Sequence, residues 1–101
     1  MSFAQSAQDN TRLRIRLGQV VVTPAALLAL EEAGQSPEEF LERHQSGDWG
    51  EVGAEDWKEN ELSVKKGYRV LSTYTLSTRK TIWIITEADR SATTVLLPED
   101  Y

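Results

Sequence analysis

Apolar and polar residues alternate at the start of the patterned part of the chain. Over residues 12–17 arginine alternates with leucine or isoleucine, so that all the aliphatic side chains share one side. An alternation of period two predicts a β-strand with one buried face. Gly18 interrupts the pattern, and we expect residues 19–22 to continue the strand after a bend or bulge. Residues 1–11 are polar without periodicity and are expected to form a flexible arm.

Two helices are predicted directly after this strand. Thr23 is a favourable N-cap, it is followed by proline, and residues 25–32 are rich in alanine and leucine. Gly34 suits the left-handed position that ends such a helix. The motif S-P-E-E at 36–39 is a capping box that contains a proline, and the second helix is predicted to run from there to about His44.

A glycine-rich segment separates these helices from a third one. Residues 47–53 contain three glycines and one tryptophan and are predicted to form a loop. Residues 54–66 are predicted to be helical because Trp57, Glu61 and Val64 fall on one side at helical spacing.

The pattern then changes to strands, which are predicted over 68–76, 80–87 and 92–97. Residues 81–85 are apolar on both faces, which is typical of the central strand of a sheet covered on both sides, and Trp83 within them is expected in the core. The predicted fold is α+β, in the order β-α-α-α-β-β-β. Helices are expected on one face of a mostly antiparallel sheet that ends in a three-stranded meander, with the first strand at an edge. Residues 12–101 are expected to form a single domain.

Composition limits the possible chemistry. The chain has 101 residues, no cysteine and one histidine, which excludes disulfides, thiol catalysis and sites with several histidine ligands. We expect neither a metal nor a cofactor. The sequence contains no apolar run long enough to cross a bilayer and no signal-peptide pattern at its start, so a cytoplasmic protein without membrane contact is expected.

Charge is distributed unevenly along this acidic chain, which has a net charge of −5. Residues 31–62 contain eleven acidic residues and two basic ones, whereas the rest of the chain is net positive. One interpretation is an acidic surface that docks on a basic protein, such as a nucleic-acid-binding complex. The other is a set of solvated helix faces. The candidate partner-binding residues are Glu38, Glu42, Asp48, Trp49, Glu55, Asp56, Trp57 and Glu59. Trp49 or Trp57 could be an exposed anchor of the interface, or both could pack between the helices and the sheet.

Three further features have both a functional and a structural interpretation. The arginines of the first strand could contact phosphates or pair with acids, but direct nucleic-acid binding is not expected from an acidic chain. His44 could be a general base or a cation that complements the end of its helix. The loop with Glu87, Asp89, Arg90 and Ser91 could be a polar site, or a turn closed by Asp89 and Ser91 in which Arg90 pairs locally.

The string W-I-I-T-E-A-D-R-S at 83–91 is distinctive, as are L-G-Q-V-V at 17–21, G-D-W-G at 47–50 and L-L-P-E-D-Y at 96–101. Together they resemble a family of small bacterial proteins carried on plasmids and integrative elements. The resemblance implies a mobile-element setting and no particular activity. Small acidic proteins of such elements are similar in size and charge to counter-defence inhibitors of restriction or CRISPR systems.

The sequence therefore predicts a non-enzymatic binding protein of mobile elements, an anti-restriction or anti-CRISPR inhibitor for example. The alternative is a small ribonuclease or toxin that uses basic residues of the sheet. Its candidate residues are Tyr68, Arg69, Arg79, Lys80 and Arg90. A homodimer formed through the sheet edge or the two-sided apolar strand is compatible with either function.

Overall fold

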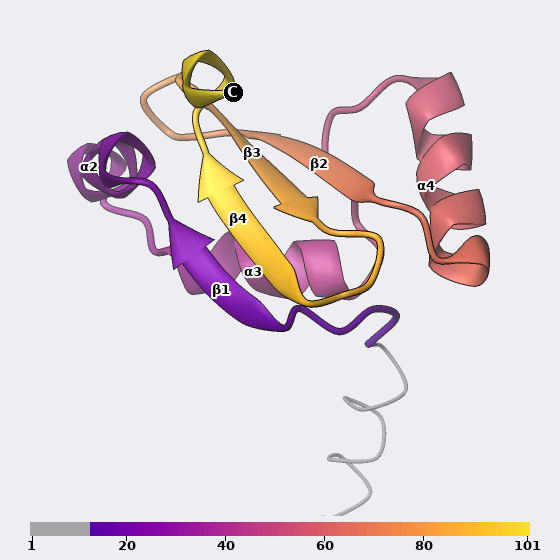
Figure 1. The fold of residues 1–101 in the computed structure, drawn as a ribbon. Coiled ribbons are helices and arrows are strands. Elements are labelled where there is room, and N and C mark those ends of the chain that lie inside the picture. Colours follow the sequence, from indigo (N-terminus) through magenta and orange to yellow (C-terminus); the bar gives the residue numbers. More distant parts are fainter. Residues whose placement is uncertain (1–12) are drawn as a thin grey trace, which may run out of the picture.

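A computed structural model describes residues 13–101 (Figure 1), so the predicted arm over 1–11 lies outside the described residues. The α+β class and the predicted order of elements are confirmed. The elements are β1 (Gln19–Val22), α2 (Pro24–Ala33), α3 (Pro37–Gln45), α4 (Ala54–Lys66), β2 (Val70–Thr75), β3 (Thr81–Thr86), β4 (Ala92–Leu96) and the short 3-10 helix η1 (Pro98–Asp100). Among the described residues, no helix has the length and apolar character needed to cross a membrane.

The four strands form one sheet in the order β1-β4-β3-β2. The β2–β3 and β3–β4 pairs are antiparallel, but β1 runs parallel to β4, with Gln19 beside Ala92 and Val22 beside Val95. The sheet is therefore mixed, and the prediction of a mostly antiparallel sheet was wrong. The physical reason is the long connection through three helices, which lets β1 pair with the last strand instead of with its neighbour in sequence. The predicted edge position of the first strand is confirmed.

The first strand is shorter than its alternating pattern predicts, because residues 13–18 are not part of the sheet. The Arg14 N–H donates to the Gln45 carbonyl (2.8 Å), and Ile15 is buried in a small cluster beside Trp49. Gly18 has φ +64°, and a Cβ at this position would lie 2.4 Å from the Ser91 carbonyl. Residues 13–18 are thus an irregular segment in spite of their alternating pattern. Pairing of β1 with β4 begins only after Gly18, where the backbone passes close to Ser91.

The helix starts follow their sequence signals with one exception. Thr23 caps α2 by accepting the Ala26 N–H (3.1 Å), and Gly34 ends the helix in the left-handed conformation. Helix α3 begins after Ser36 as predicted, but the Ser36 side chain makes no capping hydrogen bond. The expected capping box is therefore not formed, and Glu39 instead accepts a hydrogen bond from a neighbouring glutamine side chain.

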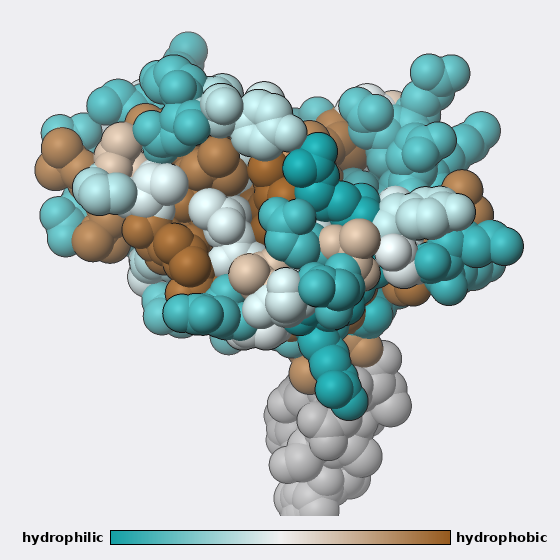
Figure 2. Space-filling model, viewed as in Figure 1, coloured by the Kyte–Doolittle hydropathy of each residue, from teal (hydrophilic) through white to brown (hydrophobic). Residues whose placement is uncertain are grey.

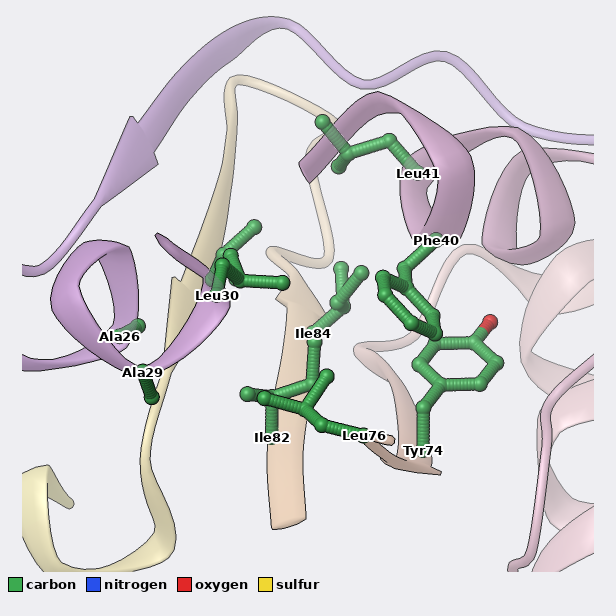
Figure 3. Close-up of a cluster of buried hydrophobic side chains, with 10 residues drawn as sticks. Ala26, Ala29, Leu30, Phe40, Leu41, Tyr74, Leu76, Ile82 and Ile84 are labelled. Atoms are coloured by element: carbon green, nitrogen blue, oxygen red, sulfur yellow. The ribbon is translucent and has the colours of Figure 1, made fainter. Parts of the chain in front are cut away.

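Helices α2 and α3 cover one face of the sheet and bury its main core (Figure 3). Phe40 from α3 points at Tyr74 from β2, with ring centroids 5.3 Å apart, and Leu30 from α2 reaches toward Ile84 of β3. Each of these side chains is almost completely buried. Burial of a large apolar side chain contributes about 1.5–3 kcal/mol, so this cluster is the main source of stability.

The opposite face of the sheet has a thinner cover. Strand β3 is an interior strand, and Ile85 and Leu96 on this side are buried. Trp83 is only half-buried and meets the edge of the Tyr101 ring at 5.8 Å. The expectation that Trp83 belongs to the core was therefore wrong, because its face is covered by the short C-terminal turn of η1 and Tyr101 and not by an α-helix.

Candidate functional site

His44 lies on the inner side of α3, and none of its surface is exposed. Its Nδ1 is 2.6 Å from Ser72 Oγ, and its Nε2 is 2.9 Å from Thr86 Oγ1. Thr86 Oγ1 is in turn 2.8 Å from Thr93 Oγ1, and Thr93 donates to the Leu17 carbonyl (2.7 Å). This network connects α3 with three strands and with the segment before β1.

The direction of each hydrogen bond in this network follows from counting protons. Thr93 uses its one hydroxyl proton on the Leu17 carbonyl, so Thr86 must donate to Thr93. The Thr86 oxygen then accepts from His44 Nε2–H, and Nδ1 accepts from the Ser72 hydroxyl. The hydrogen bonds thus place a proton on Nε2, and because the buried ring is neutral, His44 is the Nε2–H tautomer.

Burial, and to a smaller extent the positive charge of Arg90, lower the pKa of His44 to about 4. The imidazole is therefore neutral at pH 7. The predicted role as a cation that complements the end of α3 was wrong, because the side chain points into the core and carries no charge. The alternative of a general base is disfavoured by the same geometry, since both ring nitrogens are occupied by internal hydroxyls.

The loop that follows β3 is held together by its own polar residues. Asp89 Oδ1 accepts the Ser91 N–H (3.0 Å), which is the turn predicted by the structural interpretation. The Ser91 side chain and then the Ser91 N–H lower the pKa of Asp89. Arg90 has φ +62° and donates to the carbonyls of Tyr68 (2.7 Å), Ser63 (2.9 Å) and Glu87 (3.1 Å).

The Arg90 guanidinium therefore sits at the C-terminal end of α4, where carbonyl groups lack helical partners. Its hydrogen bonds go to backbone oxygens and not to a neighbouring carboxylate. Glu87 and Ser91 remain exposed on this loop. The polar residues of 87–91 thus form a turn after β3, and the hydrogen bonds of Arg90 connect this turn to the end of α4.

Trp49 cannot be an exposed anchor, because it is completely buried. Its Nε1–H donates to Glu61 Oε2 (2.9 Å), and the same oxygen forms an ion pair with Arg14 (2.9 Å). These contacts lower the pKa of Glu61, with the Arg14 hydrogen bond as the largest cause. By contrast Trp57 on α4 keeps 36% of its surface exposed.

Asp48 is also part of the fold and does not belong to a free acidic surface. Its carboxylate accepts from Arg43 Nε (2.7 Å) and from the Gly50 N–H (3.0 Å). The Arg43 hydrogen bond is the main reason why the pKa of Asp48 is lowered. The Asp48 carbonyl also accepts the Tyr74 hydroxyl (2.6 Å), so the loop is tied to the core.

The other acidic candidates are exposed, and within residues 13–101 they form no ion pair. They are Glu38 and Glu42 on α3 and Glu55, Asp56 and Glu59 on the first half of α4; we call these five residues the acidic surface. The second half of α4 carries Lys65 and Lys66, so the charge of this helix reverses along its length. Hydrophilic side chains cover the α4 side of the molecule in Figure 2.

A hollow of about 210 Å³ lies on the thinly covered face of the sheet. Its walls are apolar, and Arg69 at its rim donates to the Tyr101 hydroxyl (3.1 Å). The hollow is lined by Arg69, Leu71, Trp83, Ile85 and Tyr101. No group of three metal-ligating side chains occurs in the described part of the chain.

Basic residues proposed for a ribonuclease lie at opposite ends of the β2–β3 hairpin. Val70 pairs with Thr86 at one end, close to Arg69 and Arg90, whereas Thr75 pairs with Thr81 at the other end. Arg79 and Lys80 are in the turn at that second end, and Lys80 pairs with Glu32 (3.2 Å). The structure does not bring these five candidates together, although Arg90 does reach the Tyr68 carbonyl.

Some structural roles were missed in the sequence although a signal existed. Ser72 stands between Val70 and Tyr74, so the alternation of the strand already directs its hydroxyl to the buried face. Thr86 and Thr93 face the same side. Buried hydroxyls need partners, and His44 is the partner that the helical layer supplies.

No protein-family model, curated protein or solved structure matches this chain. The resemblance of residues 83–91 and the other quoted stretches to a mobile-element family therefore stays a prediction.

Proposed function

We propose that the protein is a non-enzymatic binding module whose acidic surface docks on a basic protein. The observation that supports this proposal is the division between two kinds of acidic residue. Glu32, Asp48 and Glu61 are paired with bases of the same molecule. The five residues of the acidic surface are exposed and have no such partner in the described residues.

Electrostatics favours a basic partner for these residues. Neighbouring carboxylates repel one another, and a positively charged surface relieves that repulsion and accelerates encounter. Trp57 lies beside Asp56 at the start of α4 and adds a half-exposed aromatic side chain of the kind that anchors interfaces. More specifically, the proposed partner is a nucleic-acid-binding defence protein of the bacterial host. The acidic surface would occupy the basic groove in which that protein binds nucleic acid.

The polar groups that could perform chemistry are instead used to build the fold. His44 is neutral and enclosed by hydroxyls, and Arg90 is bound to backbone carbonyls. This favours binding over catalysis. The candidate residues of the ribonuclease alternative are divided between the two ends of the β2–β3 hairpin, and Arg90 is bound to backbone carbonyls, so we do not propose it.

The test is affinity purification from a bacterial lysate at low and high salt, with mass spectrometry of what is retained. Two double variants reverse charge on the acidic surface, Glu38→Lys with Glu42→Lys and Glu55→Lys with Glu59→Lys. A matched control, Glu87→Lys with Glu99→Lys, changes the net charge equally at exposed positions elsewhere.

We expect one basic nucleic-acid-binding protein to be retained at low salt and released at about 1 M salt, where the Debye length falls to about 3 Å. At least one surface variant should lose this protein, while the control keeps it. Equal retention by all variants, or recovery of RNA in place of a protein, would contradict the proposal.

A further inference from the structure

The fold closes one edge of the sheet with its own residues. On β2, the Thr73 N–H donates to the Trp49 carbonyl (3.2 Å), and the Thr73 carbonyl accepts the Glu51 N–H (2.8 Å). Asn60 Nδ2 donates a hydrogen bond to the Leu71 carbonyl (2.7 Å), and Asn60 Oδ1 accepts one from the Leu71 N–H (3.2 Å). The loop after α3 and helix α4 thus satisfy this edge.

The β1 edge at the other side of the sheet is open in the described part of the chain. The Gln19 and Thr23 N–H groups donate to the Ser91 (3.0 Å) and Val95 (2.9 Å) carbonyls of the β4 side. Alternate residues of a parallel strand face the same neighbour, so the intervening Val20 and Val22 direct their N–H and C=O groups away from β4. An edge of this kind is a template for another strand.

The chemistry of this edge suits a second copy of the chain. Residues 19–30 contain no charged side chain, although the whole molecule carries a net charge of −5. Two copies repel each other through their acidic residues and can approach most closely where such residues are missing. Val20 (42%), Val21 (44%), Leu27 (43%) and Leu28 (56%) are exposed here. Figure 2 shows apolar side chains gathered over the α2 and β1 side of the molecule.

We propose that two copies pair antiparallel through β1 about a two-fold axis at Val21. In this register Val20 of each copy exchanges two backbone hydrogen bonds with the partner's Val22, so all four outward residues are satisfied. The two Val21 side chains form the central pair without hydrogen bonds, at a Cα separation of about 4.5 Å. Two four-stranded sheets then become one continuous sheet of eight strands. This proposal does not depend on the acidic surface.

Sedimentation velocity over a range of concentrations tests the pairing. We expect the protein to dimerise and Val21→Lys to weaken dimerisation at least about tenfold, because two ammonium groups meet at the axis. Leu62→Lys on α4 is the matched control, since Leu62 (43%) and Val21 (44%) are equally exposed. The proposal is wrong if the unaltered protein stays monomeric at about 1 mM, a weak limit for specific association, or if Val21→Lys dimerises as well as Leu62→Lys.

Cross-linking gives a second readout that does not rely on weakening the dimer. The chain has no cysteine, so Val21→Cys introduces a single thiol. With oxidised glutathione as the oxidant, we expect it to form an intermolecular disulfide much faster than Leu62→Cys, because a Cα separation of about 4.5 Å permits the bond. Equal rates would overturn the proposed axis. Hydrogen exchange that shows protected Val20 and Val22 amides in a monomer would also overturn it, because the edge would then be covered within one copy.

Discussion

At the scale of single residues, the burial of His44 contributes to the pH dependence of the stability of the protein. The imidazole of the unfolded chain titrates near 6.5, whereas the pKa of His44 in the folded protein is about 4. Between these values the unfolded chain binds the additional proton, so the free energy of unfolding falls as the pH falls. Above the pKa of the unfolded chain, the neutral histidine makes its full contribution to the free energy of unfolding.

We expect this single group to lower the free energy of unfolding by about 3 kcal/mol between pH 6.5 and pH 4. Urea unfolding at a series of pH values, compared with His44→Gln, measures the difference because the variant lacks the titrating group. Carboxylates contribute equally to both proteins and cancel in the comparison. A pH dependence identical in the two proteins would show that His44 is accessible to protons in the folded state.

At the scale of elements, the stability of the β2 edge depends on a backbone contact that only glycine permits. Gly50 has φ +76°, and a Cβ at this position would lie 1.9 Å from the Thr73 carbonyl oxygen. Gly53 in the same loop has no atom within 4 Å of its Cβ position. The loop must therefore move away from β2 if residue 50 gains a side chain.

Gly50→Ala is expected to destabilise the protein by at least about 2 kcal/mol, through left-handed strain and loss of the contact with β2. Gly53 is the N-cap of α4, where alanine is less favourable than glycine, so Gly53→Ala should cost no more than about 1 kcal/mol. Chemical denaturation of both variants checks the difference. Similar values for the two would mean that the loop is not tightly bound to the strand.

The two arginines with positive φ provide a second test at this scale. Arg79 (φ +75°) and Arg90 (φ +62°) both sit in turns, but only Arg90 has a side-chain hydrogen bond among the described residues. Glycine relieves the backbone strain at either position. Arg79→Gly is expected to be neutral or slightly stabilising, whereas Arg90→Gly should cost about 1–3 kcal/mol because three carbonyl groups lose a charged donor. Thermal or urea unfolding that ranks the variants in the opposite order would refute this role of Arg90.

At the scale of the whole molecule, charge and apolar surface are separated. The acidic surface belongs to α3 and α4, while the exposed aliphatic residues of the proposed dimer contact, Val20, Val21, Leu27 and Leu28, belong to β1 and α2. Partner docking and self-association therefore use different surfaces and should respond to different variants. We expect Val21→Lys to retain the basic partner in affinity purification. We expect Glu55→Lys with Glu59→Lys, which changes the net charge by about four units, to leave the dimer intact. If either variant lost both partner binding and dimerisation, the two surfaces would not be independent.

Local signals were sufficient for the helices. Thr23, Gly34 and Pro37 act through backbone geometry within one or two turns, so α2 and α3 begin and end close to their predicted bounds. The bounds of α4 follow from its helical spacing and from the glycines at its two ends. The order of elements and the turn made by Asp89 and Ser91 are local in the same sense. The exposed positions of Glu38, Glu42, Glu55, Asp56 and Glu59 agree with the charge pattern for the same reason.

Only the tertiary structure decided the burial of the tryptophans, the role of His44 and the direction of β1. Trp49 is enclosed although it lies in a glycine-rich loop, and Trp83 is half-exposed although it lies in an apolar strand. Their surroundings are set by α4 and by the C-terminal turn, which are distant in sequence. Likewise, the two hydrogen-bond partners of His44, Ser72 and Thr86, come from two separate strands. Periodicity and capping describe contacts along the chain, whereas burial, pKa and strand pairing depend on which segments the fold brings together.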